Sequence, residues 1–240
     1  MHSESDFHFF SIIVPAHNEE KYIVSTLEHI KNLNYPKDRF EVFVVENGST
    51  DNTYALAKEF ESRNITVFTV SKRGVSHAKN HGIDMISPKS EWTVILDADT
   101  HIKSNFLGSL NKYFSKKSSQ IYSVGTTYVK PIHRSLKATL WFGFYDMGHR
   151  LIKASYSIQI VKTSVLKQFR FNENLSIGED LELIKFSRQS GKFFVFRTNE
   201  VFTSTRRFED EGWFNLFLVW TFVAALPKYL KRRFSYKVVR

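Results

Sequence analysis

Two aspartates at the end of an apolar run are the residues whose types and spacing most suggest chemistry. The run from Trp92 to Thr100, WTVILDADT, ends in Asp97 and Asp99 with the small Ala98 between them. Residues two apart on a strand face the same side, so we expect both carboxylates on one face at the strand's carboxyl end. Two oxygen donors suit Mg²⁺ or Mn²⁺, which completes its shell with water and nucleotide phosphates. The pair therefore suggests a metal–diphosphate site.

A second explanation of this pair needs no ligand. Aspartate is common where strands end, and Asp99 or Thr100 could cap a helix expected from about Ser104. On the Asp-x-Asp spacing alone, this structural explanation is the stronger one. The remainder of the chain has to decide between the two.

Composition limits the class of protein. With 240 residues, 42% of them hydrophobic, the chain can bury one large core or two coupled lobes. The absence of cysteine excludes disulfides, thiolate metal sites and a cysteine nucleophile, and it fits a reducing compartment. The start, MHSESDFHFF, lacks a basic segment followed by an apolar one, so we expect no secretory signal.

Strands alternate with helices in the first half of the chain. This alternation predicts crossover connections and a mostly parallel sheet. We expect Pro15 to end the first strand, Asn18 to cap the helix after it, and Asp51 with Thr53 to begin the next helix. The strands are expected at Phe9 to Val14, Phe40 to Val45, Ile65 to Val70 and Trp92 onward, with a helix at about Val75 to Met85.

The loops after these strands carry polar residues. Because the carboxyl ends of parallel strands meet at one edge, the loops after strands one, two and four should share one cleft. The candidates there are His17, Glu19, Glu46, Asn47 and the aspartate pair. The loop after the first strand has no G-x-G-x-x-G pattern, which argues against an NAD enzyme.

The second half adds strands at Ile121 to Val129, Ser157 to Val161 and Lys192 to Arg197, and a helix from Leu136 to Ile152. Apolar residues recur along that helix at helical spacing. We interpret this stripe first as core and second as a wall for an apolar acceptor. The stripe consists of Leu136, Leu140, Phe144, Met147 and Leu151.

Charged residues of the second half are open to two interpretations. Glu179 and Asp180 follow Gly178 at the start of a helix, where the macrodipole favours acids, or one of them is a general base. Arg206 and Arg207 lie among hydroxyl residues, as an oxyanion clamp or as a solvated surface pair.

The end of the chain is apolar and then basic. Trp213 to Leu226 is shorter than the roughly 20 residues of a spanning helix, and six Lys or Arg residues without an acid follow up to Arg240. This order favours contact of residues 213–240 with an anionic membrane surface. The alternatives are packing on the protein's own core or on a second subunit in a homodimer.

The ordered motifs SIIVPAHNEE, VVENGSTDNT, LDADT, GED and TSTRRF resemble family 2 glycosyltransferases of the GT-A fold, over roughly Phe9 to Phe208. The resemblance implies an α/β, Rossmann-like, mostly parallel sheet with helices on both faces, plus a C-terminal apolar helical segment. It also implies three regions: a nucleotide-sugar-binding half at 1–125, an acceptor-binding half with the catalytic base at 126–208, and the apolar helix and basic tail at 209–240.

The resemblance further implies roles for single residues. Asp97 and Asp99 would bind Mn²⁺ or Mg²⁺, with Ala98 between them, and Asp180 would deprotonate the acceptor. The donor would contact Pro15, His17, Glu19, Glu46, Asn47, Lys79, Arg206 and Arg207. The family often has Asp-Asp where this chain has Glu46-Asn47, and commonly Arg in place of Lys79, so these departures leave the base open. The resemblance implies UDP as the default nucleotide and GDP as the second candidate.

The function expected is that of an inverting, metal-dependent glycosyltransferase with a lipid-linked or glycan acceptor, peripheral at the cytoplasmic face of a membrane. One alternative is a peripheral membrane-binding module with a non-catalytic nucleotide-sugar pocket. Another is a nucleotidyltransferase, which would normally show a Gly-rich loop where PAHNEE stands. Nucleic-acid binding is the weakest option, because the aromatics beside the basic tail form an apolar block.

Overall fold

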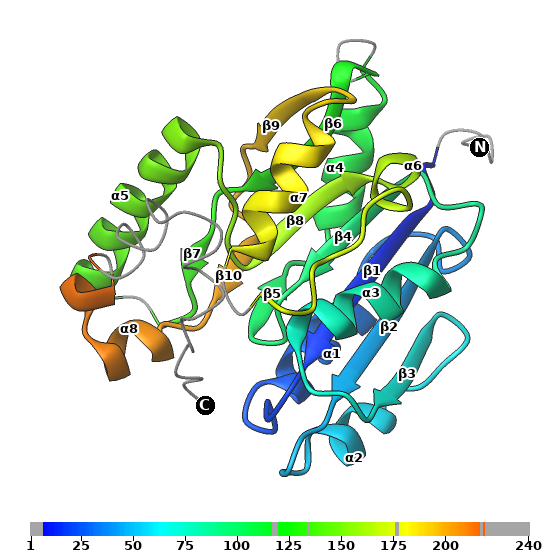
Figure 1. Cartoon of the computed structure of the whole chain (residues 1–240), viewed down its shortest axis with the longest axis horizontal. Coiled ribbons are helices and arrows are strands. Elements are labelled where there is room, and N and C mark those ends of the chain that lie inside the picture. Colours follow the sequence, from blue (N-terminus) through cyan, green and yellow to red (C-terminus); the bar gives the residue numbers. More distant parts are fainter. Residues whose placement is uncertain (1–6, 117–119, 134, 176–177, 217, 219–240) are drawn as a thin grey trace.

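A seven-stranded sheet forms the centre of the computed structural model, which describes residues 7–116, 120–133, 135–175, 178–216 and 218 (Figure 1). Its strand order is β3-β2-β1-β4-β8-β6-β9. Neighbouring strands are parallel except for β8, which is antiparallel to both β4 and β6. The predicted mostly parallel α/β sheet is confirmed. The strands are β1 (Phe10–Ala16), β2 (Phe40–Asn47), β3 (Ile65–Val70), β4 (Trp92–Leu96), β6 (Tyr122–Thr127), β8 (Ile158–Lys162) and β9 (Lys192–Phe196).

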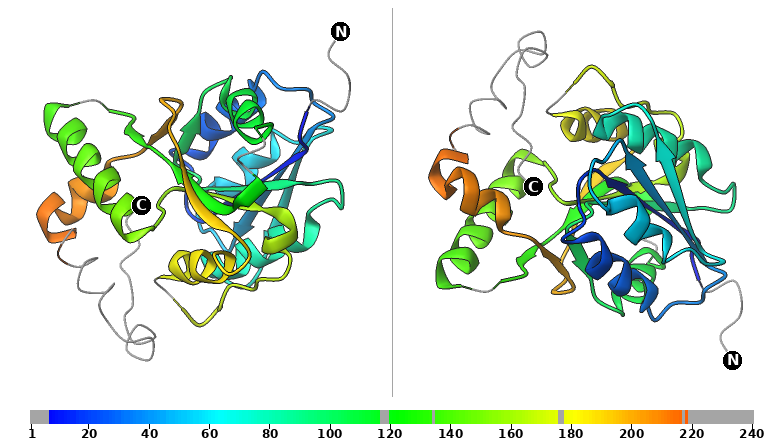
Figure 2. Two further views of the ribbon diagram at one scale, coloured as in Figure 1. Left: turned by 90° about the horizontal axis from the view of Figure 1, so that it is seen from above. Right: turned by 90° about the horizontal axis from the view of Figure 1, so that it is seen from below.

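Helices cover both faces of this sheet (Figure 2). Ile12 and Val14 of β1 belong to the core shared with α1, α2 and α4, whereas Ile13 belongs to the core shared with α3, α6 and α7. Successive side chains of a strand point to opposite faces, so a central strand has to be apolar throughout. The helices are α1 (Ile23–Lys31), α2 (Thr53–Lys58), α3 (Val75–Met85), α4 (Phe106–Phe114), α6 (Thr163–Leu166) and α7 (Glu179–Ser187).

A small second sheet connects the large one to a helical lobe at its side (Figure 1). Its strands β5 (Thr100–Ile102), β10 (Val201–Thr203) and β7 (Lys130–Pro131) lie in the order β5-β10-β7. The lobe contains α5 (Leu136–Ile152) and α8 (Arg206–Glu211). Because β10 pairs with β5, the start of α8 lies beside the turn that carries Asp97 and Asp99.

Two local expectations after the first strand are wrong. Pro15 lies within β1, opposite Val45 of β2, rather than ending the strand. The pairing of β1 with β4 ends at Ile13, so β1 has a partner strand on one side only at Pro15, where a residue without an N–H is tolerated.

Asn18 does not cap the first helix, which begins at Ile23 after Tyr22. Its side-chain Oδ1 instead accepts a hydrogen bond of 2.7 Å from the backbone N–H of Thr50. Its own N–H donates to Ser49 Oγ at 2.9 Å. Asn18 therefore joins the loops after β1 and β2.

The apolar stripe of α5 faces solvent. Leu136, Leu140, Phe144 and Met147 are 46% to 79% exposed, whereas, among the side chains of the helix that the structure describes, Ala138 and Phe142 are buried. The first interpretation of the stripe as core is therefore wrong, because only the opposite side of α5 packs onto the protein. The side chain of Leu151 lies outside the described part.

The predicted boundary at residues 125 and 126 falls inside β6, so the large sheet continues across it. The assignment of the two halves to donor and acceptor stays a prediction. Of the predicted apolar segment from Trp213 to Leu226, the structure describes residues 213–216 and 218, and the basic tail lies outside the described residues. None of the helices in the described ranges has the length and apolar character needed to span a membrane.

Candidate active site

Asp97 and Asp99 lie on a turn between two strands. β4 ends at Leu96 and β5 begins at Thr100, whose backbone N–H donates to the carbonyl of Asp97 at 3.0 Å. The expectation that both carboxylates share one face of one strand is therefore wrong. The turn nevertheless brings their charges close together at the carboxyl end of β4.

Hydrogen bonds between the backbone of this turn and three other segments fix it. They come from α1, from the residue before β8 and from the connection between β10 and α8. Neither Asp99 nor Thr100 caps α4, which begins at Phe106 after Asn105, so the capping role considered for them is wrong. The bonds are Asp97 N–H to the Ser157 carbonyl at 2.9 Å, Thr26 Oγ1 to the Ala98 carbonyl at 2.7 Å, and Ser204 N–H to the Asp99 carbonyl at 3.2 Å.

Asp97 experiences opposing charges. Burial and, second, the charge of Asp99 raise the pKa of Asp97 to about 6, against the lowering by Lys79 and Arg207. A carboxylate pair of this kind is stabilised by any cation placed between its members.

Arg206 connects the turn to the loop after β1. Its Nη2 lies 2.6 Å from Glu19 Oε1 and 3.1 Å from Asp99 Oδ2. The guanidinium also lies 4.7 Å from the ring centroid of Tyr22. These contacts hold a planar donor of several N–H groups beside the aspartate pair.

Lys79 of α3 meets the start of α7. This lysine is 1% exposed, and its Nζ lies 2.7 Å from Asp180 Oδ1 and 3.1 Å from Glu179 Oε1. Burial raises the pKa of Asp180 above its usual range, and the charges of Glu179 and Asp97 add to that rise against the lowering by Lys79. Asp180 is therefore suited to accept a proton near neutral pH.

Asn80 and Glu173, which the sequence analysis did not single out, hold the segment before α7 against α3. The side-chain amide of Asn80 donates to the carbonyl of Phe171 and accepts from its N–H, each at 2.9 Å. Glu173 accepts hydrogen bonds from Lys72, His77 and Asn80, which lower the pKa of Glu173 to about 2. The one sign of these contacts in the sequence is that Asn80 directly follows Lys79.

Glu46 and Asn47, at the end of β2, bond to β1, to β3 and to the loops after β2 and β3. Glu46 accepts from the Ser49 N–H and, at 2.7 Å, from Thr69 Oγ1. Asn47 donates to the Ala16 carbonyl at 2.9 Å and accepts from the Gly74 N–H at 3.0 Å. These side chains thus hold the end of β2 to its neighbouring strands and to the loops after β2 and β3. Their role in reading a base stays a prediction.

The predicted residues thus gather in two connected clusters. One joins Glu19, Asp99 and Arg206, and the other joins Lys79 with the acids of α7. Asp97 connects them, because it interacts electrostatically with Asp99, Lys79, Arg207 and Glu179. Pro15 is buried in β1 and His17 is half-buried in the loop after it, beside the first cluster in sequence.

The sequence profile of the family described as "Glycosyl transferase family 2" matches residues 11–175, which is more than half of the chain. The chain belongs to glycosyltransferase family 2. The enzyme class and the family predicted from the ordered motifs are confirmed.

Relatives and solved structures of this family extend the comparison. The Methanococcus voltae protein named dolichyl N-acetyl-alpha-D-glucosaminyl phosphate 3-beta-D-2,3-diacetamido-2,3-dideoxy-beta-D-glucuronosyltransferase is 26% identical, over 89% of this chain and 77% of that protein. The crystal structure of Staphylococcus aureus TarS 1-349 with UDP-GlcNAc has a TM-score of 0.67 at 20% identity, over 93% of this chain and 69% of that one.

A mannosyltransferase from Pyrobaculum calidifontis, solved with GDP-Man and Mn²⁺, has a TM-score of 0.66 at 18% identity, over 86% of this chain and 60% of that one. These structural likenesses show the GT-A fold, which confirms the predicted fold class. The chain spans less than two thirds of the length of several curated relatives.

The donor set of this family 2 chain fits a divalent cation. Among the described residues, no group of three or more His, Asp or Glu side chains could hold an ion by itself. The turn offers the two carboxylates of Asp97 and Asp99, and a small divalent ion that keeps waters and binds phosphates needs few protein ligands. The mutual repulsion that contributes to the raised pKa of Asp97 is what such an ion would relieve.

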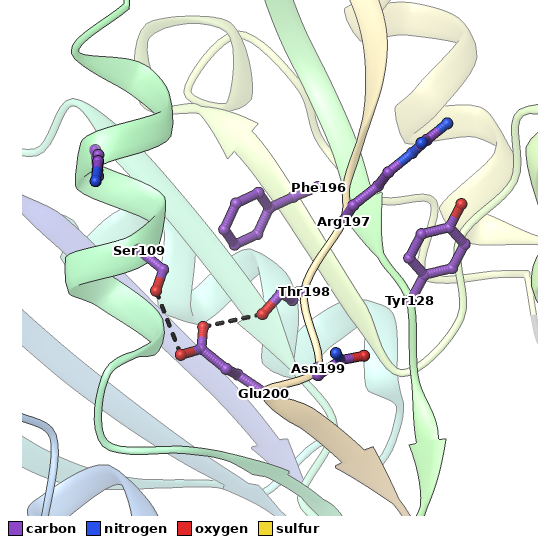
Figure 3. A pocket seen from close by; sticks show the side chains of 8 residues that line it. Ser109, Tyr128, Phe196, Arg197, Thr198, Asn199 and Glu200 are labelled. Carbon is purple, nitrogen blue, oxygen red and sulfur yellow. Dashed lines mark hydrogen bonds between the residues drawn. The ribbon is translucent and has the colours of Figure 1, made fainter.

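A separate pocket of about 580 Å³ lies between α4 and the connection from β9 to β10 (Figure 3). In it, Glu200 accepts hydrogen bonds from Ser109 at 3.3 Å and from Thr198 at 2.9 Å. Lys112, Tyr128 and residues 196–200 also line the pocket, and none of the predicted site residues does. It lies apart from the two clusters.

Proposed function

We propose that this family 2 glycosyltransferase moves a sugar from a nucleotide-diphosphate sugar to an acceptor hydroxyl, with inversion at the anomeric carbon. UDP-sugars are the first candidates for the donor and GDP-sugars the second. The proposal rests on two adjacent clusters, Arg206 with Glu19 and Asp99, and Lys79 with Glu179 and Asp180. Asp97 interacts electrostatically with members of both. In this proposal the diphosphate binds at the cluster of Arg206 and Asp99, and the sugar lies toward Asp180.

The base in this proposal is Asp180 rather than Glu179. The Asp180 side chain is 25% exposed and that of Glu179 is 12% exposed, so Asp180 is the more accessible to an acceptor. Lys79 holds Oδ1 of Asp180, while Oδ2 is not bonded by any described residue. That second oxygen is available to an acceptor hydroxyl.

The reaction then balances in a single displacement. The acceptor oxygen attacks the anomeric carbon from the face opposite the diphosphate, its proton passes to Asp180, and the bond from that carbon to the phosphate oxygen breaks. Arg206 and Arg207 donate hydrogen bonds to the phosphate oxygens as negative charge grows there. A bound Mn²⁺ or Mg²⁺ on Asp97 and Asp99 would neutralise part of the same charge.

The acceptor in this proposal is lipid-linked or otherwise close to a membrane. The Methanococcus voltae relative is named for a dolichyl-phosphate-linked acceptor, which supports a lipid-linked substrate class. In the sequence, the apolar segment and basic tail of residues 213–240 follow directly after α8 and would contact the cytoplasmic face of a membrane.

Thermal unfolding with ligands tests the donor assignment. A ligand that binds only the folded protein raises the unfolding temperature. We expect UDP or a UDP-sugar to raise it more in the presence of Mn²⁺ than the sum of the two separate effects, and we expect Asp99→Asn to remove this mutual dependence. Additive effects of Mn²⁺ and of every UDP- and GDP-sugar tried would contradict the proposal.

One observation favours the non-catalytic alternative, a membrane-binding module with a nucleotide-sugar pocket. Arg206 lies 3.1 Å from Asp99, where its charge can substitute for that of a cation. Hydrolysis of a sugar nucleotide stimulated by Mn²⁺ separates the two, because a non-catalytic pocket would bind the nucleotide without turning it over.

A further inference from the structure

The helical lobe carries most of the exposed large apolar side chains among the described residues. Ten such side chains are exposed, and six of them belong to α5 or to residues 213–218. Monomeric proteins rarely expose apolar side chains in one contiguous patch without a binding role. We call these six the apolar surface: Leu136, Leu140, Phe144, Met147, Phe214 and Leu218.

Helix geometry places the four α5 residues on one side. At about 100° per residue, positions 136, 140, 144 and 147 fall within about 80° of one another. Ala138 and Phe142, on the opposite side, are both 2% exposed. The exposed stripe is therefore the outer side of a packed helix and not the result of a loosely placed one.

Ring contacts hold the segment after α8 beside α5. The rings of Trp141 and Trp213 meet edge to face with centroids 5.9 Å apart, and Trp213 stacks on Phe208 at 4.9 Å. Lys137 Nζ lies 5.2 Å from the Trp213 ring centroid. Phe214 and Leu218, one helical turn apart, thus extend the exposed apolar area from α5 onto this segment.

We propose that the apolar surface docks on a lipid bilayer with anionic headgroups. The last described residue, Leu218, belongs to this surface, and the sequence continues with VWTFVAAL and then six basic residues without an acid. A group of apolar side chains next to a run of cationic residues matches the acyl chains and charged headgroups of such a bilayer. This rests on the proposed membrane contact of residues 213–240 and extends it to α5.

Insertion into the bilayer and preference for anionic lipid come from different parts of the chain. Lys137 and Lys153 are balanced by the exposed acids Glu209 and Asp210, so the described lobe has little net attraction for anionic lipid. Insertion therefore comes from the apolar surface, and the preference for anionic lipid comes from the basic residues between Lys228 and Arg240.

Docking would also orient the active site. Arg206, which contacts Asp99, begins α8, and Phe208 of the same short helix stacks on Trp213. A lobe bound to lipid through Phe214 and Leu218 would keep the aspartate pair close to the bilayer. A lipid-linked acceptor could then reach the cleft without leaving the membrane.

Co-sedimentation of the full chain with vesicles tests the proposal. The vesicles are phosphatidylcholine alone and phosphatidylcholine mixed with phosphatidylglycerol. Replacing the four α5 residues together by Gln, a good helix former, should lower partitioning about tenfold or more on both vesicle types. Met147→Gln alone should lower it severalfold, while its matched control Met85→Gln, a methionine 40% exposed on α3, should leave it unchanged.

Unchanged partitioning of the fourfold variant would overturn the proposal. If that variant instead loses stability and keeps its partitioning, residues 219–226 or a second copy of the chain cover the surface, which overturns it as well. Phe144→Gln provides the same comparison should the fourfold variant not fold. Since the readout is lipid binding, a failure here leaves the transferase proposal standing, and a transferase failure leaves this one standing.

Discussion

Lys79 and Asp180 form an ion pair of 2.7 Å, although they lie 101 positions apart in the sequence. Lys79 lies on α3, which packs on β1 and β2, and Asp180 lies on α7, which packs on β6. On one face of the sheet, the pair therefore joins the helix over β1 and β2 to the helix over β6, where the proposed donor and acceptor meet.

Removing the charge of Lys79 should destabilise the protein. Lys79→Met leaves Glu179 and Asp180 without their cation in a site where Lys79 itself is 1% exposed. Breaking a buried pair costs about 3–5 kcal/mol, and the partial exposure of Asp180 reduces this to about 2–3 kcal/mol of the free energy of unfolding. Urea denaturation measures the loss.

The matched control for this variant is Lys58→Met. Lys58 pairs with Glu61 on the surface, where both side chains are more than a third exposed, so the free energy of unfolding should hardly change. Equal losses for Lys58→Met and Lys79→Met would contradict a structural role for the Lys79 pair.

The pH dependence of transfer should report the pKa of Asp180. Burial raises this pKa to about 7, and the base must be ionised, so kcat/KM should rise with pH through that value. Lys79 lowers the pKa of Asp180, hence Lys79→Met should move the midpoint to higher pH. A profile that is flat through neutrality, or a midpoint that moves to lower pH in Lys79→Met, would rule out Asp180 as the titrating base.

Replacing Arg206 should impair transfer from the sugar donor more than it destabilises the fold. Arg206→Met removes the hydrogen-bond-donating guanidinium that Glu19 and Asp99 hold beside the proposed diphosphate. The value of kcat/KM should therefore fall about a hundredfold. Arg206→Lys should recover part of this loss, because a lysine keeps the charge but not the planar fork. Steady-state kinetics with a UDP-sugar measures both.

Arg170→Met serves as the comparison for Arg206→Met. Arg170 pairs with Asp84 on the surface, with both side chains 55% exposed, and lies outside the two clusters. Its kcat/KM should match that of the unmodified protein. A similar fall in both variants would show that the effect comes from the net charge of the protein rather than from the site.

Elements set by local pattern could be predicted closely from the sequence. The bounds of β3 and α3 match the expected Ile65 to Val70 and Val75 to Met85, because turn residues and a change of apolar period flank them. The closeness of Asp97 and Asp99 also follows from their spacing, even though they lie on a turn and not on a strand.

Features set by long-range packing could not be predicted in this way. Periodicity showed that the α5 stripe occupies one side of a helix, but not whether that side faces the core or solvent. The bonds from Asn80 to Phe171 depend on how the chain returns along the antiparallel β8, which no local pattern encodes. The loop bonds of Glu46 and Asn47 depend in the same way on neighbouring strands.

Transfer by Asp180→Asn, with nucleotide binding measured on the same preparation, tests the central claim most directly. The amide cannot take the acceptor's proton, and Lys79 keeps Glu179 as a partner, so the variant should fold. We expect kcat to fall by about 10²–10⁴-fold while the affinity for UDP stays within about twofold, and Glu179→Gln to retain most of its turnover. Full turnover in Asp180→Asn together with an inactive Glu179→Gln would contradict the account.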